Sequence, residues 1–263
     1  MKANLVRVDD VGSNAKTFWF RPQQLVRYVA GEFIELHLPH ANADERGTMH
    51  YFSLSSSPTE PLLSITTTFA RPGQRSSTFK QLLRSLPVGS EVTIVEPMGD
   101  FVLPKDRRIP LAFVAVGMGI APMVSMVKYL RDTGERRDIR LLYGARHVHE
   151  LLFLDVFRDY GLTPELVVSR PGTDWQGETG QITIARILRL LDSFPSSEPS
   201  GVQKTPVTNS QKPVSMAETV RTAPLIYLAG PEPLVEKLGH ELETARIPKQ
   251  HIIIDFFSGY RDV

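Results

Sequence analysis

The sequence predicts a two-domain protein: an antiparallel β-barrel followed by an α/β domain with a parallel sheet. Its 263 residues, 41% of them hydrophobic, are enough to fill two cores of ordinary size. Up to about residue 103, short β-like runs alternate with turn residues, which is typical of an antiparallel barrel. From about residue 104, nearly continuous apolar runs alternate with amphipathic helical stretches, which indicates a parallel sheet covered on both faces. We therefore expect domains at residues 1–104 and 105–263.

The expected elements of the first domain are five strands and one helix. The strands are residues 16–22, 32–39, 51–58, 62–70 and 91–99. Residues 76–86 form the helix, because Phe79, Leu82, Leu83 and Leu86 follow helical spacing. Ser76, Ser77 or Thr78 can serve as its N-cap.

The second domain shows a repeated strand and helix rhythm. The expected strands are residues 111–116, 139–145, 164–170, 225–230 and 251–257. The expected helices are residues 123–134, 150–161, 183–194 and 233–245. Residues 193–223 are rich in Ser, Pro and Thr and cannot bury a core, so we expect a surface insertion there. A phosphorylated or partner-binding segment is the alternative.

Composition excludes several kinds of function. Lys and Arg number 30 against 29 for Asp and Glu, so the overall charge favours neither nucleic acid nor an anionic membrane as a partner. The absence of cysteine excludes disulfides, thiolate zinc sites, a cysteine nucleophile and a cysteine-ligated iron-sulfur cluster on this chain. The charged N-terminal residues and the lack of an apolar run of about 18 residues predict a cytoplasmic location and no membrane span.

The strongest motif is FVAVGMGIAP, residues 113–122, in which a buried strand leads through two glycines into a helix. Such a turn lets the backbone approach a pyrophosphate at a helix N-terminus. Pro122 stands where the six-residue dinucleotide fingerprint has its third glycine, and a tight turn without a ligand is the alternative. The candidate nucleotide-binding residues of this turn are Gly117, Met118, Gly119, Ile120, Ala121 and Pro122.

Three later strands of the same predicted sheet also end in residues that could contact a bound dinucleotide. Ligands bind outside the carboxyl ends of parallel strands, so these residues extend the predicted dinucleotide crevice. They are Ala229, Gly230 and Pro231 after one strand, Gly144, Ala145 and Arg146 after another, and Ser169 and Arg170 after a third.

Eight motifs in order resemble the ferredoxin-NADP reductase superfamily of two-domain flavoproteins. The motifs are HYFSLSSSP, GQRSSTF, EPMGDFVLP, AVGMGIAP, LLYGARHVHELLF, VVSRPG, LAGPEPLV and DFFSGY. The resemblance covers almost the whole chain except the insertion. It implies an FAD-binding first domain and a second domain that binds NADPH or NADH.

The resemblance also implies which residues contact the flavin. Phe52 would pack against the flavin ring and Ser53 would approach its N5 atom, while an ordinary serine-rich barrel strand is the alternative. His50 replaces the family arginine that meets the pyrophosphate, and a neutral imidazole offers one hydrogen bond in place of a charged fork. The serines of the second motif would bind phosphate, or would only cap the helix. The full set of flavin candidates is His50, Tyr51, Phe52, Ser53, Thr67, Arg75, Ser76, Ser77 and Thr78.

On the nicotinamide side, the chain departs from the family at two places. Ala229-Gly230-Pro231 replaces Cys-Gly-Pro, so no thiol assists the hydride step, and Met118 stands where the plant-type branch often has Thr. Ser169 and Arg170 resemble a 2'-phosphate site, which favours NADPH and leaves NADH open. The ending resembles the family's acidic-x-aromatic terminus, with Asp255 and Phe257, or Tyr260, beside the flavin; a core strand is the alternative. The predicted catalytic residues are Phe52, Ser53 and Phe257.

The leading hypothesis is an FAD-dependent NAD(P)H oxidoreductase that needs neither a metal nor a protein nucleophile. A flavin-binding electron-transfer subunit with little activity alone is the second, and a dinucleotide-binding regulator without redox chemistry is the third. A ferredoxin, a flavodoxin, an oxygenase component, a ferric chelate or a heme protein could each accept the electrons. A basic cluster at Arg107, Arg108, Arg136 and Arg137 would dock an acidic carrier, or would simply be solvated.

Overall fold

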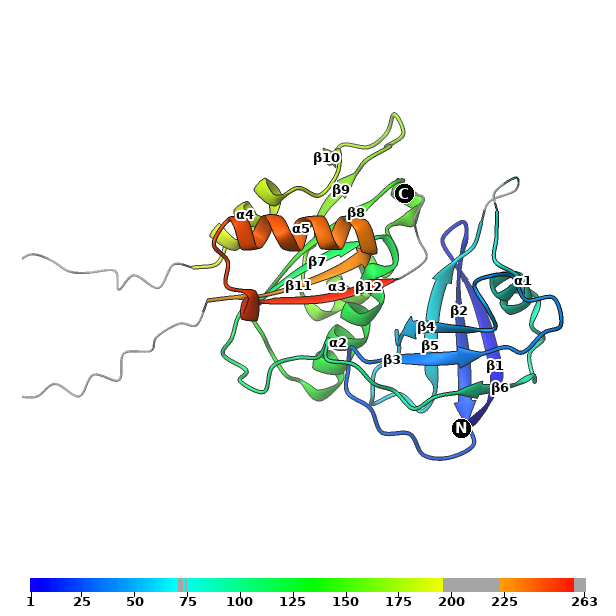
Figure 1. Ribbon diagram of the computed structural model, residues 1–263. Helices are drawn as coiled ribbons and strands as arrows, with labels where there is room; N and C mark the ends of the chain where they lie inside the picture. Colours follow the sequence, from blue (N-terminus) through cyan, green and yellow to red (C-terminus); the bar gives the residue numbers. More distant parts are fainter. Residues whose placement is uncertain (71–72, 74, 196–222, 258–263) are drawn as a thin grey trace, which may run out of the picture.

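The computed structural model describes residues 1–70, 73, 75–195 and 223–257, and these residues form two six-stranded sheets (Figure 1). The first sheet has the order β4-β3-β6-β1-β2-β5, and its paired strands are antiparallel. A bridge between Leu54 and Ile65 joins the two ends of this order, so the sheet closes into a barrel. Its elements are β1 (Lys2–Val11), β2 (Ala15–Pro22), β3 (Phe33–His37), β4 (Met49–Ser53), β5 (Leu63–Thr68), α1 (Thr78–Ser85) and β6 (Glu91–Ile94).

The barrel core is built by alternating side chains, as a half-buried strand requires. Phe18 and Phe20 of β2 are fully buried, and Phe79 and Leu83 of α1 pack against the same cluster. The expected strand at residues 51–58 ends at Ser53, and the side chains of the serines after it bond to Ser64 of β5.

The second sheet is parallel and has the order β10-β9-β8-β7-β11-β12. The two sheets confirm the predicted fold class. The strands are β7 (Leu111–Val116), β8 (Ile139–Ala145), β9 (Glu165–Val168), β10 (Glu178–Thr179), β11 (Leu225–Pro231) and β12 (Ile252–Phe257). Short 3-10 turns lie at η1 (Gly117–Gly119), η2 (Val148–Glu150) and η3 (Lys249–His251).

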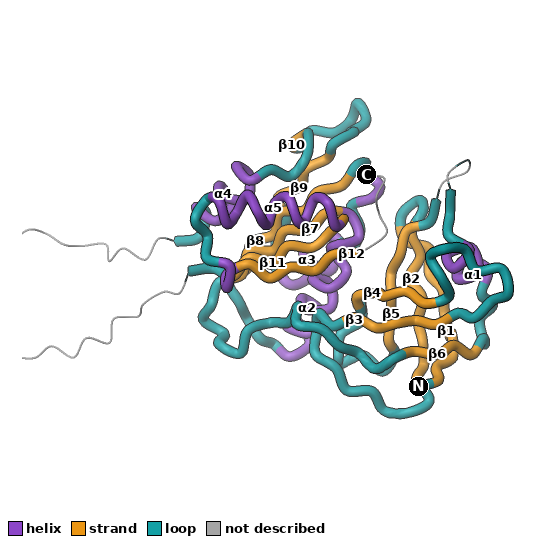
Figure 2. Tube along the Cα trace, in the orientation of Figure 1, coloured by secondary structure: helices purple, strands orange, loops and turns teal. Residues whose placement is uncertain are grey.

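Helices cover both faces of the parallel sheet (Figure 2). On β7, Phe113 faces α2 (Ile120–Thr133) and α3 (Leu154–Tyr160), whereas Val114 faces α4 (Ile184–Asp192) and α5 (Glu232–Thr244). The helix α2 begins three residues earlier than expected, directly after η1, and α3 begins four residues later than expected, at Leu154. Residues 196–222 of the expected insertion lie outside the described residues. No helix in the described ranges has the length and apolarity needed to cross a membrane.

Candidate functional site

The parallel sheet grows first on one side of β7 and then on the other. The strands run outward from β7 to β8 and β9, and the chain then returns to place β11 on the other side of β7. The crevice at such a reversal is where open α/β sheets bind ligands. The residues Gly117 and Gly119 follow β7, and Ala229 and Gly230 lie at the end of β11, so the structure brings these four predicted residues together.

The two glycines of the turn are needed for different structural reasons. A Cβ atom on Gly119 would lie 2.1 Å from the Ala229 carbonyl oxygen, so only glycine lets η1 lie against the end of β11. Gly117 has a φ of +55° and no atom within 4 Å of its Cβ position, so it leaves open space above the turn. The remaining predicted residues of this turn pack locally: Met118 is half-buried, and Ile120, Ala121 and Pro122 are buried in the first turn of α2.

The ends of β8 and β9 are tied together by backbone hydrogen bonds. The N–H of Arg170 donates to the Arg146 carbonyl at 2.7 Å, and the N–H of Ser169 donates to the Ala145 carbonyl at 3.0 Å. The His147 ring nitrogen Nδ1 lies 3.0 Å from the Arg170 carbonyl oxygen, a contact the sequence did not predict. The side chain of Arg170 is exposed and that of Arg146 is half-buried, so the crevice end of both strands carries guanidinium groups.

Gly144, which precedes these loops, lets the Ile182 side chain pack closely against β8. Its Cβ position lies 3.0 Å from the Ile182 side chain just before α4. Pro231 is the last residue of β11 and is half-buried.

The strand β4 presents its predicted residues to opposite faces. His50 and Phe52 face α1, where the Phe79 ring lies 4.3 Å from the His50 ring and 6.0 Å from the Phe52 ring. Phe52 is 8% exposed and belongs to the barrel core. Tyr51 points the other way, half-exposed, with its ring edge-on to Phe33 at 5.5 Å.

The imidazole of His50 is incompletely satisfied. Its Nε2 atom is buried and has no hydrogen-bond partner within the described part of the chain. Burial lowers the pKa of His50, and the positive charges of Lys80 and Arg46 lower it further. An unpaired buried nitrogen at the position of the family's pyrophosphate arginine fits a ligand that supplies a hydrogen-bonding atom.

The first turn of α1 is held by a loop that the sequence did not single out. The Ser77 side chain caps the helix and accepts from the Lys80 N–H at 3.1 Å. The Thr78 N–H donates to the Asp44 carboxylate at 3.1 Å, and the Asp44 N–H donates to the Thr78 hydroxyl at 3.0 Å. Arg46 lowers the pKa of Asp44 to about 2, so this carboxylate is ionised at neutral pH. An internal anion therefore occupies one N–H group assigned to phosphate.

The other predicted flavin residues make fewer contacts that bear on a flavin site. Ser76 is half-buried, with its hydroxyl 3.5 Å from the Ser77 carbonyl, and Arg75 is exposed. Thr67 is buried within β5, opposite Lys16 of β2.

Ser53 and Asp255 join the two domains. The Ser53 hydroxyl donates to the Asp255 carboxylate at 2.9 Å, although the two residues lie on β4 and β12. Ser53 is 3% exposed, and burial raises the pKa of Asp255 to about 6. Because β12 pairs with β11, this contact lies beside the strand that carries the second glycine turn. Phe257 ends β12 in register with Pro231, its side chain lies outside the described residues, and so does Tyr260.

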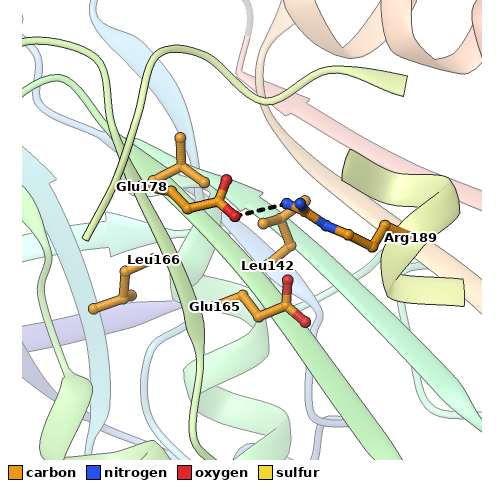
Figure 3. A pocket seen from close by; sticks show the side chains of 6 residues that line it. Leu142, Glu165, Leu166, Glu178 and Arg189 are labelled. Atoms are coloured by element: carbon orange, nitrogen blue, oxygen red, sulfur yellow. Dashed lines mark hydrogen bonds and ion pairs between the residues drawn. The ribbon is translucent and has the colours of Figure 1, made fainter. Parts of the chain in front are cut away.

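A separate cavity of about 400 Å³ lies at the β9–β10 edge (Figure 3). Leu142, Glu165, Leu166 and Glu178 line it, and Arg189 of α4 forms an ion pair with Glu178 at 2.8 Å. None of the predicted site residues contributes to this lining, so the cavity is not the predicted crevice.

Comparisons with known proteins agree with this architecture. Residues 113–239 match the oxidoreductase NAD-binding domain family. The chain is 26% identical over 242 residues to the reductase component of propane 2-monooxygenase from Rhodococcus jostii, covering 87% of this chain and 55% of that protein. The chain thus spans little more than half the length of this curated relative.

Two solved structures share the fold across almost the whole chain. One is the cytochrome b5 reductase domain of Ulva prolifera nitrate reductase, with a TM-score of 0.72 and 17% identity over 97% of this chain and 96% of that one. The other is the flavohem-like FAD/NAD-binding domain of nitric oxide dioxygenase from Vibrio cholerae, with a TM-score of 0.70 and 16% identity over 97% and 98%. The closed barrel, the parallel sheet with its glycine turns and these likenesses agree with the resemblance to the ferredoxin-NADP reductase superfamily that the sequence motifs indicate.

Proposed function

We propose that the chain is an FAD-dependent oxidoreductase that passes a hydride from NADPH or NADH to FAD and then passes electrons to a separate acceptor. The hydrogen bond between Ser53 and Asp255 carries this proposal, because it joins the predicted flavin strand to the sheet that holds the nucleotide crevice. The names of the similar proteins support it: one is a reductase component, and another is an FAD/NAD-binding domain.

Under this proposal, residues 1–104 bind the flavin and residues 105–263 bind the nucleotide. FAD held there would supply the redox chemistry, namely hydride acceptance from the nicotinamide and electron release to the acceptor singly or in pairs. The His50 Nε2 atom, which has no hydrogen-bond partner among the described residues, is available to the flavin phosphates, and Phe52 and Phe257 are assigned to the flavin ring.

Ser53 and Asp255 have a proton-holding role in this proposal. With a pKa of about 6, the Asp255 carboxyl is protonated in mildly acidic solution, one hydrogen bond from the Ser53 hydroxyl. The pair therefore holds an exchangeable proton at the junction of the two domains, shielded from bulk water by burial.

The nucleotide assignment rests on the open space at Gly117 and on two guanidinium groups. The open space at Gly117 is assigned to the pyrophosphate, and Arg170 and Arg146 suit the 2'-phosphate of NADPH. These side chains favour NADPH over NADH as the hydride donor.

The acceptor is assigned by similarity. We place an oxygenase component first among the acceptors that fit, ahead of a ferredoxin, a flavodoxin or a ferric chelate, because the Rhodococcus relative serves a monooxygenase. The same name, a component of a larger system, supports the second function: an electron-transfer subunit with little activity alone. A cytoplasmic location stays a prediction.

The test is an anaerobic visible spectrum of the protein reconstituted with FAD and titrated separately with NADPH and NADH. We expect the flavin absorbance to bleach at a lower concentration of NADPH. Ser53→Ala is expected to slow bleaching while retaining FAD, and Ser13→Ala, in an exposed turn, is the matched control. A protein that stays colourless after reconstitution refutes the proposal. Bound FAD that neither nucleotide bleaches supports the subunit role instead.

A further inference from the structure

The serines that follow β4 are buried and bonded within the barrel. Ser55, Ser56 and Ser57 are at most 1% exposed. The Ser55 hydroxyl lies 2.9 Å from that of Ser64, and the Ser56 hydroxyl accepts from the Ser64 N–H at 2.9 Å and contacts the Tyr28 hydroxyl at 2.9 Å. Such a run of hydroxyls holds the backbone of the segment in one place on the barrel.

The same segment is also bonded to α2 of the other domain. Three residues at helical spacing, and therefore on one face of α2, reach residues 56–60 of the barrel domain. The contacts are Ser125 Oγ to the Ser56 carbonyl at 2.5 Å, Lys128 Nζ to Glu60 Oε2 at 3.3 Å, and Thr59 Oγ1 to Asp132 Oδ2 at 2.5 Å. We call residues 55–60 with Ser125, Lys128 and Asp132 the serine latch.

The latch is well shielded from solvent at its centre. Ser125 is fully buried, and the side chain of Lys128 is 13% exposed. The Lys128 ammonium also lies 5.4 Å from the centre of the Trp19 ring. Hydrogen bonds in such surroundings are stronger than exposed ones and fix direction as well as distance.

The latch is connected to the Ser53–Asp255 contact by short stretches of chain on both sides. Ser56 follows Ser53 by three residues, which is about 10 Å of extended chain. On the other side, α2 follows β7 directly after η1, and β7 is bonded through β11 to β12, which carries Asp255. The second route runs through paired strands and the first through serines bonded to β5, so both connect the latch to the contact.

We propose that the serine latch fixes the orientation of the two domains and thereby holds Asp255 against Ser53, which makes Ser125 and Lys128 positioning residues for the hydride step. The catalytic consequence rests on the proposed function. Domains in one chain move relative to each other unless their interface prevents it. The neighbouring apolar contacts, where Ala30 and Phe101 pack in the same cluster as Met126, resist separation, whereas the directional bonds of the latch resist rotation.

The test measures the titration of Asp255 itself. The full chain, labelled with ¹³C-aspartate and without added flavin, is titrated by NMR, and Asp255→Asn identifies the signal. The carboxylate is bonded by the Ser53 hydroxyl and the Phe256 N–H, and no charged side chain in the described residues contributes to its pKa shift. Its midpoint therefore reports how well the junction excludes water.

The decisive variant combines Ser125→Ala with Lys128→Met, and we expect the Asp255 midpoint to fall from about 6 toward the ordinary value of about 3.9. The matched control combines Thr133→Ala, whose hydroxyl bonds only to carbonyls of α2 itself in the described structure, with Lys237→Met on α5. This control is expected to leave the midpoint unchanged. Lys128→Arg keeps the charge and is expected to behave like the wild type.

A folded double variant with an unchanged midpoint overturns the proposal, as does an equal shift in the control. If the double variant does not fold, the two single variants decide, because each must lower the midpoint further than its control. With FAD bound, stopped-flow bleaching by NADPH is expected to slow in the latch variants without a change in FAD affinity. Failure of the wild type to bleach would refute the proposed function and leave the NMR result standing.

Discussion

Replacing Asp255 by Asn removes a carboxylate that folding largely withdraws from water. Burial raises the pKa of Asp255 from 3.8 to about 6, so the folded protein prefers the neutral form. This preference stabilises the fold fully below pH 3.8 and is lost as the pH rises through 6. At ~1.36 kcal/mol per pKa unit, the loss amounts to about 3 kcal/mol. Asn is neutral at every pH and still accepts from the Ser53 hydroxyl.

We expect the unfolding free energy of Asp255→Asn, relative to wild type, to increase by about 2.5 kcal/mol between pH 4 and pH 7, since part of the loss has already occurred at pH 4. Urea denaturation followed by circular dichroism at several pH values measures this difference. Asp106→Asn is a control of opposite sign, since Arg108 lowers the pKa of Asp106 to about 2, and its removal costs stability at neutral pH. A pH-independent difference for Asp255→Asn, or one that falls as the pH rises, would refute the reasoning.

Three further substitutions test the site. His50→Arg adds charge-assisted hydrogen bonds of ~1.5–3 kcal/mol to the flavin phosphates, so the FAD Kd measured by flavin fluorescence quenching falls about tenfold or more; no change contradicts that placement. Arg170→Gln raises the KM for NADPH about tenfold and leaves the KM for NADH unchanged. The control Arg189→Gln, at the separate cavity, changes neither KM. An equal effect of Arg170→Gln on both nucleotides argues against a 2'-phosphate site. Gly119→Ala places a Cβ 2.1 Å from a carbonyl oxygen of β11 and costs about 3 kcal/mol, seen as a lower Tm, while Gly172→Ala, with no atom within 4 Å, leaves the Tm unchanged.

The sequence predicted the buried parallel strands best. The runs at 111–116 and 139–145 match β7 and β8 residue for residue, because strands covered on both faces are nearly continuous in apolar residues. The strand β1 was missed because Arg7, Asp9 and Asp10 break up its short apolar positions. The strand β10 has two exposed residues and therefore shows no pattern at all.

The site residues at the ends of parallel strands were predicted from the sequence. The contacts between segments far apart in the sequence were missed. The glycines after β7 and β11 stand out because parallel strands place their carboxyl ends together. Asp44 reads as an ordinary turn residue, and its bond to Thr78 joins segments 34 residues apart. Ser125 is a polar residue on an apolar helix, and only the folded structure shows that its partner is the carbonyl of Ser56.

The orientation of Asp255 on β12 also bears on how the chain avoids association with its own copies. Exposed sheet edges invite strand addition from other molecules, and proteins counter this with closed barrels, very short edge strands and inward-pointing charges. In the described structure the bridge at Leu54 closes the barrel, and the parallel sheet ends on one side with the two-residue β10. On the other side it ends with β12, where Asp255 points into the domain junction. Asp255 is thus an inward-pointing charge on an edge strand, which is one of the devices by which proteins disfavour strand addition.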